Sequence, residues 1–366
     1  MTMPLFFIAL LSAYLIGNLY IFIRGAQAVT HLPWGFKILL ALLFWCTALS
    51  FIGSFLMRDL KLPVTLSHTL HTVGTGWLVF TLYMVLCLLF FDLLRLFNTP
   101  FKQGFTLSLL LTISLLGYGY YNLKNPQTKV INITINHSIT QNKQPIKAIA
   151  ISDVHLGHGT GKKQLKQYVD HINNLHPDLI LIAGDLIDNS VTPLYEQQMQ
   201  EELSQLQAPL GIYMVPGNHE FISGIEKCIP FLEQTPIRLL RDTVITLPNG
   251  LQLIGRDDRS NRKRLPLETL IKQTDPTKPT FLLDHQPYHL SKTEKAGIDI
   301  QFSGHTHHGQ IWPITLLTDY LFEQSYGYRQ WGKSHIYVSS GLSLWGPPFR
   351  IGTNSEFVLF NITGKE

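Results

Sequence analysis

Residues 146–155 read IKAIAISDVH, a mostly apolar run that stops at two polar side chains, Asp153 and His155. The same arrangement returns four times further along the chain. Apolar runs also lead into Gly184-Asp185, Gly217-Asn218, Asp284-His285 and Gly304-His305. Short runs of this kind are typical of strands buried on both faces. We therefore expect the polar side chains to gather where loops leave the carboxyl ends of the strands.

The segments around these motifs predict two sheets flanked by helices. Strand patterns precede the motifs at residues 146–152, 178–183, 212–215, 281–283 and 298–303, and others lie at 244–247, 251–254, 335–339 and 356–362. The alternating stretch 130–135 predicts an edge strand. Helical patterns cover residues 162–175 and 194–206. This alternation favours α/β layering, and we expect a four-layer αββα sandwich.

The first third of the chain is far more apolar than the rest. The chain has 366 residues, of which 45% are hydrophobic, and its mean hydropathy is +0.12. Four apolar stretches, residues 3–23, 34–56, 72–97 and 105–121, are each near the roughly 20 residues that cross a bilayer as a helix. A cleaved signal peptide is disfavoured, because no basic segment precedes the first stretch and three more follow it. We predict an all-α transmembrane bundle over 1–121, a linker and edge strand over 122–145, and an α/β domain with the polar motifs over 146–366.

Charge and cysteine content exclude several classes of protein. The formal net charge of +4 is modest and gives no reason to expect nucleic acid as a partner. Three cysteines, two of them in apolar segments, disfavour a disulfide framework and a zinc-cysteine site. The apolar stretches lead us to expect an integral membrane protein. The basic residues between them divide evenly, so the side of the membrane on which the polar domain lies is undetermined.

The motif residues carry the oxygen and nitrogen donors that divalent transition metals accept. Asp153 and His155 are two residues apart, and on an extended segment they would point the same way. Asp185 follows a glycine at a turn, where its carboxylate can bridge two ions. The remaining donors are an amide and three imidazoles, from Asn218, His285, His305 and His307. This set is enough for two adjacent cations, and manganese, iron or zinc suits it better than copper.

The order of the motifs resembles the calcineurin-like metallophosphoesterases. The shared pattern is Asp-x-His, Gly-Asp-x-x-Asp, Gly-Asn-His-Glu, His and Gly-His-x-His, spread over residues 146–362. The resemblance implies a first metal held by Asp153, His155, Asp185 and His307. It implies a second metal held by Asp185, Asn218, His285 and His305. It also implies hydrolysis of a phosphate ester by a metal-bound hydroxide, without a covalent enzyme intermediate.

The histidine of the third motif has a different role under this resemblance. His219 would contact the phosphate and protonate the leaving oxygen. Asp188 or Glu220 would orient it, which suits a general acid held in one tautomer. These three residues are therefore the predicted catalytic residues.

The C-terminal motifs are similar to those of the bacterial membrane-associated branch of the family. That branch includes proteins related to UDP-2,3-diacylglucosamine pyrophosphohydrolases, and the resemblance implies an integral protein of a bacterial inner membrane. The similarity lies in Gly309-Gln310, Tyr326-Gly327, Ser339-Ser340-Gly341-Leu342, Pro348 and Arg350. The chain departs from the branch at His308, where glycine is common. This imidazole either reaches the substrate or faces solvent, and we favour solvent.

We therefore predict a membrane-bound phosphoesterase whose anchor holds the site near the bilayer. Membrane lipids surround it, and its substrate is a phosphorylated lipid or a lipid-linked nucleotide. The alternative is a transporter or sensor with a non-catalytic phosphate-binding domain, which the complete ligand set and the scarcity of charges in the apolar stretches disfavour. A nuclease is disfavoured by the low net charge and the anchor.

Two further segments each allow two interpretations. The segments Arg256-Asp257-Asp258-Arg259 and Arg262-Lys263-Arg264 form either a solvated loop, which we favour, or a contact to an anionic headgroup or second phosphate. Trp345, Pro347 and Phe349 either line an apolar substrate rim or pack a terminus.

Overall fold

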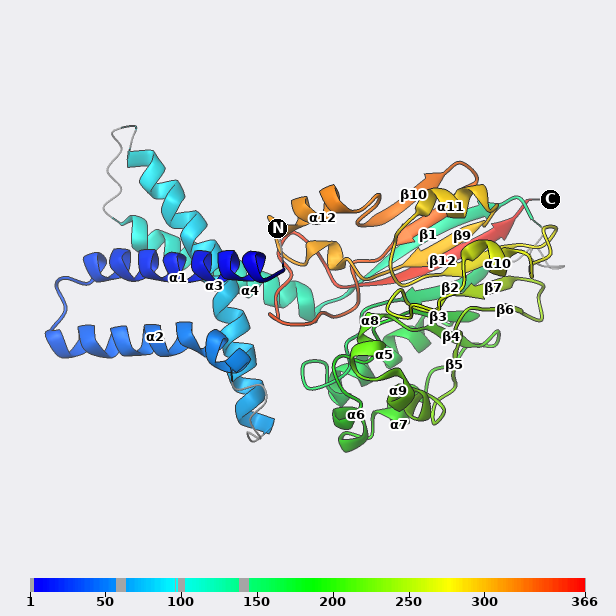
Figure 1. The fold of residues 1–366 in the computed structure, drawn as a ribbon, viewed down its shortest axis with the longest axis horizontal. Helices are drawn as coiled ribbons and strands as arrows, with labels where there is room; N and C mark the ends of the chain where they lie inside the picture. The colour runs from blue at the N-terminus through cyan, green and yellow to red at the C-terminus, as the bar shows by residue number, and fades with distance from the viewer. Residues whose placement is uncertain (1–2, 57–63, 96, 98–102, 138–144, 366) are drawn as a thin grey trace. The chain divides into compact units, whose positions relative to one another are not determined.

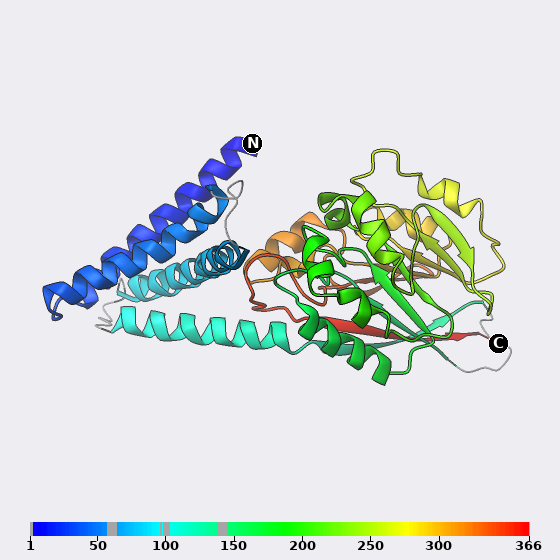
Figure 2. The same cartoon turned by 90° about the horizontal axis from the view of Figure 1, so that it is seen from below.

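The computed structural model describes residues 3–56, 64–95, 97, 103–137 and 145–365. The chain divides into two compact units. The first contains Met1–Tyr121 and Gly346–Ile351, and the second contains Asn122–Trp345 and Gly352–Glu366. The helices of the first unit and the sheets of the second can be followed in Figures 1 and 2.

The first unit is built from four long apolar helices, α1 (Met3–Ala28), α2 (Trp34–Leu56), α3 (Val64–Arg95) and α4 (Gly104–Lys124). All four are long and apolar enough to cross a membrane, as predicted. The helix α3 begins at Val64, earlier than the predicted residue 72. Asp92 of α3 accepts a hydrogen bond from the Tyr20 hydroxyl at 2.5 Å and pairs with Arg24 at 2.7 Å. These contacts join α1 to α3, as expected of an ionisable residue in an apolar helix.

The second unit contains two six-stranded sheets. The first has the order β1-β12-β2-β3-β4-β5, and the second has the order β10-β11-β9-β8-β7-β6. The strands are β1 (Gln127–Ile135), β2 (Ile146–Ile151), β3 (Leu179–Ala183), β4 (Ile212–Val215), β5 (Ile237–Leu239), β6 (Thr243–Thr246), β7 (Gln252–Gly255), β8 (Thr280–Leu283), β9 (Ile300–Ser303), β10 (Gly327–Trp331), β11 (Ser334–Val338) and β12 (Glu356–Gly364). β2 to β5 run parallel, as do β7, β8, β9 and β11. β1 is an edge strand, as its alternating pattern predicted.

Helices cover the outer faces of both sheets (Figure 1). The helices of this unit that the structure describes are α5 (Lys162–Asn174), α6 (Thr192–Glu196), α7 (Met199–Leu203), α8 (Asn218–Ile222), α9 (Ile225–Leu232), α10 (Leu267–Ile271), α11 (Leu290–Lys295) and α12 (Ile314–Leu321), with a 3-10 turn η1 (His307–Gly309). The cluster over the first sheet combines β2, β3 and β4 with α5, α7 and α9. The cluster over the second sheet includes α10.

Neighbouring residues of the central strands face different cores. In β3, Ile180 and Ile182 pack toward the helices of the first sheet, whereas Leu179 and Leu181 pack between the sheets with Phe281. Successive side chains of a strand point to opposite faces, so a strand covered on both sides must be apolar throughout. The αββα layering predicted from the apolar runs is confirmed.

Three local expectations are corrected. The predicted helix over 194–206 is broken into α6 and α7, because Gln198 adopts a left-handed conformation (φ 52°) between them. Two strands were not predicted: β5 has only three residues, and β10 is mostly exposed and lacks an apolar run.

Of the two roles considered for Phe349, lining a substrate rim or packing, the structure shows packing. Within the first unit, the Arg350 backbone N–H donates to the Gly119 carbonyl at 2.9 Å. A Cβ on Gly119 would lie only 3.2 Å from the Cβ of Phe349. This short segment therefore packs against α4.

Candidate active site

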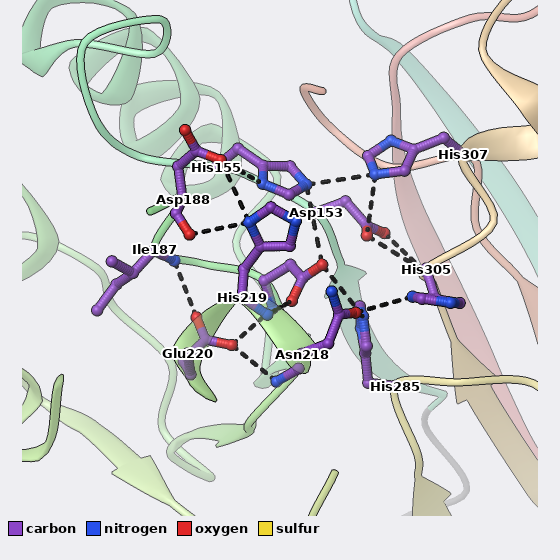
Figure 3. A network of polar contacts seen from close by, with 12 residues as sticks. Asp153, His155, Ile187, Asp188, Asn218, His219, Glu220, His285, His305 and His307 are labelled. Atoms are coloured by element: carbon purple, nitrogen blue, oxygen red, sulfur yellow. Dashed lines mark hydrogen bonds and ion pairs between the residues drawn. The ribbon is translucent and has the colours of Figure 1, made fainter. Parts of the chain in front are cut away.

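The predicted ligands follow the carboxyl ends of β2, β3, β4, β8 and β9. Most lie on loops, whereas Asn218 begins α8 and His307 begins η1. These strands are neighbours within their sheets, β2-β3-β4 in one and β9-β8 in the other. The five separated motifs consequently meet in one place, as the close view in Figure 3 shows.

The backbone of these loops is left-handed at five ligand positions. The φ angles are 54° at Asp153, 48° at His155, 51° at Asp185, 72° at His305 and 49° at His307. Such angles are uncommon outside glycine and persist at functional sites where the surrounding structure enforces them. Asp153 and His155 do converge, but through left-handed turns, whereas His307 lies near Asp153 and His305 lies near Asp185. Our expectation of extended segments was wrong.

The first group of donors is Asp153, His155 and His307. The Nε2 atom of His307 lies 3.3 Å from His155 Nε2 and 3.4 Å from Asp153 Oδ1. All three residues are buried, and their donor atoms lie within 4.8 Å of one another. Two imidazole nitrogens that face each other can share only one proton, so the arrangement suits a cation between them.

The second group of donors meets the first at Asp185. The Oδ1 atom of Asn218 lies 3.1 Å from His285 Nε2 and 2.9 Å from His305 Nδ1. The Oδ2 atom of Asp185 lies 3.2 Å from His285 Nε2 and 3.9 Å from His155 Nε2. One carboxylate oxygen therefore faces both groups.

Glycines allow these loops to approach one another. A Cβ on Gly217 would lie 2.2 Å from Asp185 Oδ1, and a Cβ on Gly304 would lie 2.3 Å from Asp153 Oδ2. A Cβ on the glycine before Asp185, which has φ +77°, would lie 2.6 Å from His285 Nδ1. Any larger residue would displace a ligand on another loop. This explains why three of the motifs have a glycine before the ligand.

His219 lies beside the ligands and is held by Asp188. Its Nδ1 atom is 2.9 Å from the Asp188 carbonyl oxygen and 3.3 Å from Asp188 Oδ1. Asp188 Oδ1 also lies 3.3 Å from His155 Nδ1. The donors of His219, His155 and Asp185 lie within 4.8 Å, so distance alone does not separate His219 from the ligands. Because Nδ1 faces Asp188, the nitrogen left for other contacts is Nε2.

Glu220 does not occupy the orienting position that we considered for it. Its buried carboxylate accepts backbone N–H bonds from Asp185 at 2.9 Å, Ile187 at 2.9 Å and Gly217 at 2.7 Å. These bonds join the loop after β3 to the loop after β4. Glu220 is therefore a positioning residue for two ligand loops, and Asp188 is the carboxylate placed against His219.

The site shifts the pKa values of its groups in opposite directions. Burial opposes protonation of His219, but the hydrogen bond to Asp188 and the charge of Asp185 outweigh it and raise the pKa to about 9. Burial, reinforced by His285, lowers the pKa of His305 to about 4. Burial alone would raise the pKa of Asp185, but the charge and hydrogen bond of His285 hold it below its usual range. A neutral imidazole and an ionised carboxylate are the forms that bind cations.

Backbone groups complete the site. The carbonyl oxygen of Ala183 lies 2.7 Å from His285 Nδ1, which directs Nε2 of that ring toward the donors. The backbone N–H of His305 lies 3.1 Å from both carboxylate oxygens of Asp153. Such contacts orient metal ligands. Sequence reasoning missed them, because every residue carries the same backbone groups.

Comparison with known proteins agrees with this geometry. Residues 146–309 match the family described as calcineurin-like phosphoesterase. A metallophosphoesterase from Helicobacter pylori (strain J99) is 34% identical over 263 residues, which cover 69% of each chain. The chain belongs to the calcineurin-like phosphoesterase family. It is thus a metal-dependent phosphoric ester hydrolase, and its clustered histidine and aspartate donors fit divalent cations.

Relatives occur in animals as well as bacteria. A protein from Danio rerio named transmembrane protein with metallophosphoesterase domain is 30% identical over 283 residues, or 73% of this chain and 63% of the relative. With the four apolar helices, this relative supports a membrane protein. Among solved structures, a 5'-nucleotidase precursor from Thermus thermophilus aligns over 59% of this chain and 55% of its own, with 15% identity and a TM-score of 0.38.

Two residues near the site have roles that the sequence left open. The His308 ring stacks on Tyr326 with centroids 4.6 Å apart, and its Nε2 lies 3.5 Å from Asp319 Oδ1. His308 therefore packs within the fold, rather than facing solvent as we favoured. The exposed Trp345 ring lies 6.5 Å from the His219 ring, which keeps Trp345 as a candidate for the substrate rim.

Proposed function

We propose that the protein is a membrane-anchored phosphoesterase of the bacterial inner membrane that hydrolyses a phosphate ester or pyrophosphate with two divalent ions, manganese, iron or zinc. The ligands of the first ion are Asp153, His155, Asp185 and His307. The ligands of the second are Asp185, Asn218, His285 and His305. The observation that carries the proposal is the Asp185 Oδ2 atom, which faces an imidazole of each group.

His219 and Asp188 would assist departure of the leaving group. When bound, the two cations would supply a water of lowered pKa and compensate charge on the phosphoryl oxygens. His219 presents Nε2 toward the donors because Asp188 holds Nδ1. From there His219 contacts the phosphate and donates a proton to the leaving oxygen, while Asp188 stabilises the charged imidazole.

The exposed face of α12 supports a lipid substrate. This helix begins seven residues after His307, and four of its apolar side chains are largely exposed: Leu316 at 60%, Leu317 at 54%, Tyr320 at 85% and Leu321 at 60%. Contiguous exposed apolar surface marks a binding site for lipid or protein. The bilayer is the occupant that we propose, because only Asn125 and Pro126 separate the apolar helix α4 from β1. Leucine and tyrosine side chains suit the boundary between headgroups and acyl chains.

The catalytic proposal is tested on the full-length protein in detergent with added manganese. We expect turnover of bis-p-nitrophenyl phosphate or p-nitrophenyl phosphate. Asp185→Asn should remove both activity and bound metal, whereas His219→Ala should remove activity and keep the metal. If His219→Ala also strips the metal, His219 is a ligand and not the general acid. Absence of turnover with manganese, iron and zinc would instead favour a phosphate-binding sensor.

The role of α12 in binding a lipid substrate is tested by comparing a lipid substrate with a soluble one. We expect the double variant Leu316→Gln, Leu317→Gln to lower hydrolysis of a vesicle-borne phospholipid, drawn from a panel of phosphatidic acid and phosphatidylglycerol phosphate, but not of bis-p-nitrophenyl phosphate. Val130→Gln changes an exposed apolar residue of β1 and serves as the control. Equal effects on both substrates, or none on the lipid, would contradict a role for α12.

A further inference from the structure

A cavity of about 300 Å³ lies beside the segment that carries His285. Its wall includes Asp284 and Gln286, the residues on either side of the metal ligand His285. The rest of the wall comes mainly from the loop after β7, residues 256–268, and from α11 with the residues before it. The cavity and the candidate metal centre therefore share the segment that follows β8.

The wall of the cavity is strongly cationic. Its lining includes five lysine or arginine residues but only two acidic residues, Glu268 and Asp284. The difference, five minus two, leaves three positive charges in excess. The five cations are Arg256, Arg259, Arg262, Arg264 and Lys292. A cavity with this surplus is suited to an anionic ligand.

Two of the positively charged side chains, Arg256 and Arg264, are largely buried. Arg256 Nη1 lies 3.0 Å from Asp284 Oδ2, and Arg264 contacts the same oxygen. The two arginine side chains are only 15% and 10% exposed. Among the described residues, neither Nε atom has a hydrogen-bond partner. Asp284 is thus the ion-pair partner of both guanidinium groups, and a buried charge that is only partly paired is costly. An anion in the cavity would add negative charge beside these two arginine residues.

Arg259 is held in place by an aromatic ring. Its guanidinium carbon lies 4.4 Å from the centre of the Tyr288 ring, and both residues line the cavity. Stacking of this kind fixes the plane of the guanidinium group, whose donors match phosphate oxygens in pairs. The loop is therefore not simply solvated, which was the interpretation that we favoured from sequence.

We infer that this cavity binds a second phosphate group, carried by the substrate beyond the phosphate that is hydrolysed. The assignment of the ligand to the substrate rests on the proposed phosphoesterase function, but the binding of a phosphate by the cavity does not. The substrate class would then be a molecule with two phosphate groups, such as a phosphorylated headgroup in diester or pyrophosphate linkage.

Binding is tested with pyrophosphate, titrated calorimetrically into the full-length protein in detergent with EDTA. The chelator keeps metal ions from contributing to the signal. We expect the double variant Arg259→Ala, Arg262→Ala to weaken binding at least tenfold. Lys263→Ala removes a positive charge from the same loop outside the cavity lining and should change binding less than twofold. Equal losses in the double variant and the control, or no loss in either, would overturn the site.

Two chromogenic esters test whether a second phosphate of the substrate occupies the cavity. They are thymidine 5'-(p-nitrophenyl phosphate) and its 3'-phosphorylated counterpart. They differ only in a second phosphate. We expect the manganese-loaded protein to prefer the 3'-phosphorylated ester in kcat/KM at least tenfold, and the double arginine variant to lose this preference while hydrolysing the other ester normally. Equal kcat/KM for the two esters with intact pyrophosphate binding would assign the cavity to free phosphate and overturn the substrate role. Turnover of bis-p-nitrophenyl phosphate but of neither thymidine ester would overturn the substrate role. Turnover of none of these esters would refute the proposed function while leaving the binding test decisive.

Discussion

Replacing Glu220 by glutamine tests whether the hydrogen bonds between its carboxylate and the backbone hold two ligand loops together. The buried carboxylate accepts three N–H bonds of 2.7–2.9 Å from Asp185, Ile187 and Gly217. Glutamine has nearly the same shape, but its NH2 group cannot accept a hydrogen bond. At least one of the three N–H groups is then left buried without an acceptor. The other bonds lose the contribution of the negative charge.

The size of the effect follows from these contacts. An unsatisfied buried N–H costs about 1–3 kcal/mol, and exchanging a charged acceptor for a neutral one removes roughly 1 kcal/mol from each remaining bond. Burial and the Asp185 charge raise the pKa of Glu220 to about 7, which means that the ionised carboxylate is unfavourable at this position. Glutamine removes this charge, which offsets part of the stability lost with the hydrogen bonds. We expect the free energy of unfolding of the second unit to fall by about 2–4 kcal/mol. For a unit of this size, the midpoint of thermal unfolding should fall by roughly 4–16 °C.

The assay is thermal unfolding of the full-length protein in detergent, followed by tryptophan fluorescence, with metal content measured on the same samples. Metal content should fall with stability, because Glu220 holds the loops that carry Asp185 and Asn218. Glu226→Gln, at an exposed acidic position on α9, is the matched control. If Glu220→Gln matches this control in both midpoint and metal content, the carboxylate does not hold the loops and the reasoning is refuted.

Three further predictions follow from the geometry of the site. Gly217→Ala places a methyl group 2.2 Å from Asp185 Oδ1, so metal content and activity should fall at least tenfold, while the circular dichroism spectrum remains that of the wild type. Asp188→Asn removes the charge beside His219 and should lower kcat by roughly 10–100-fold at saturating manganese, measured with bis-p-nitrophenyl phosphate; an unchanged kcat would count against the orienting role. EDTA should abolish activity and lower the thermal midpoint, and manganese should restore both, because a ligand that binds only the folded state stabilises it.

Much of the fold could be predicted because both faces of the central strands are buried. The apolar runs at residues 178–183 and 281–283 became β3 and β8, and the four apolar N-terminal stretches became α1 to α4. The strands that escaped prediction, β5 and β10, are short or exposed and need no apolar run. The break at Gln198 depends on a single left-handed residue, and propensity gives little warning of one.

The sequence by itself determined which donors are available and in what order, because metal chemistry requires particular side chains and these stand out at the ends of apolar runs. Tertiary structure decided how the donors meet: left-handed angles at five ligands, three glycines that admit neighbouring ligands, and Asp188 rather than Glu220 beside His219. It also decided that charged residues from separate segments line one cavity. The physical reason is that donor identity is a property of one residue, whereas distances, burial and shared protons depend on segments that are far apart in the chain.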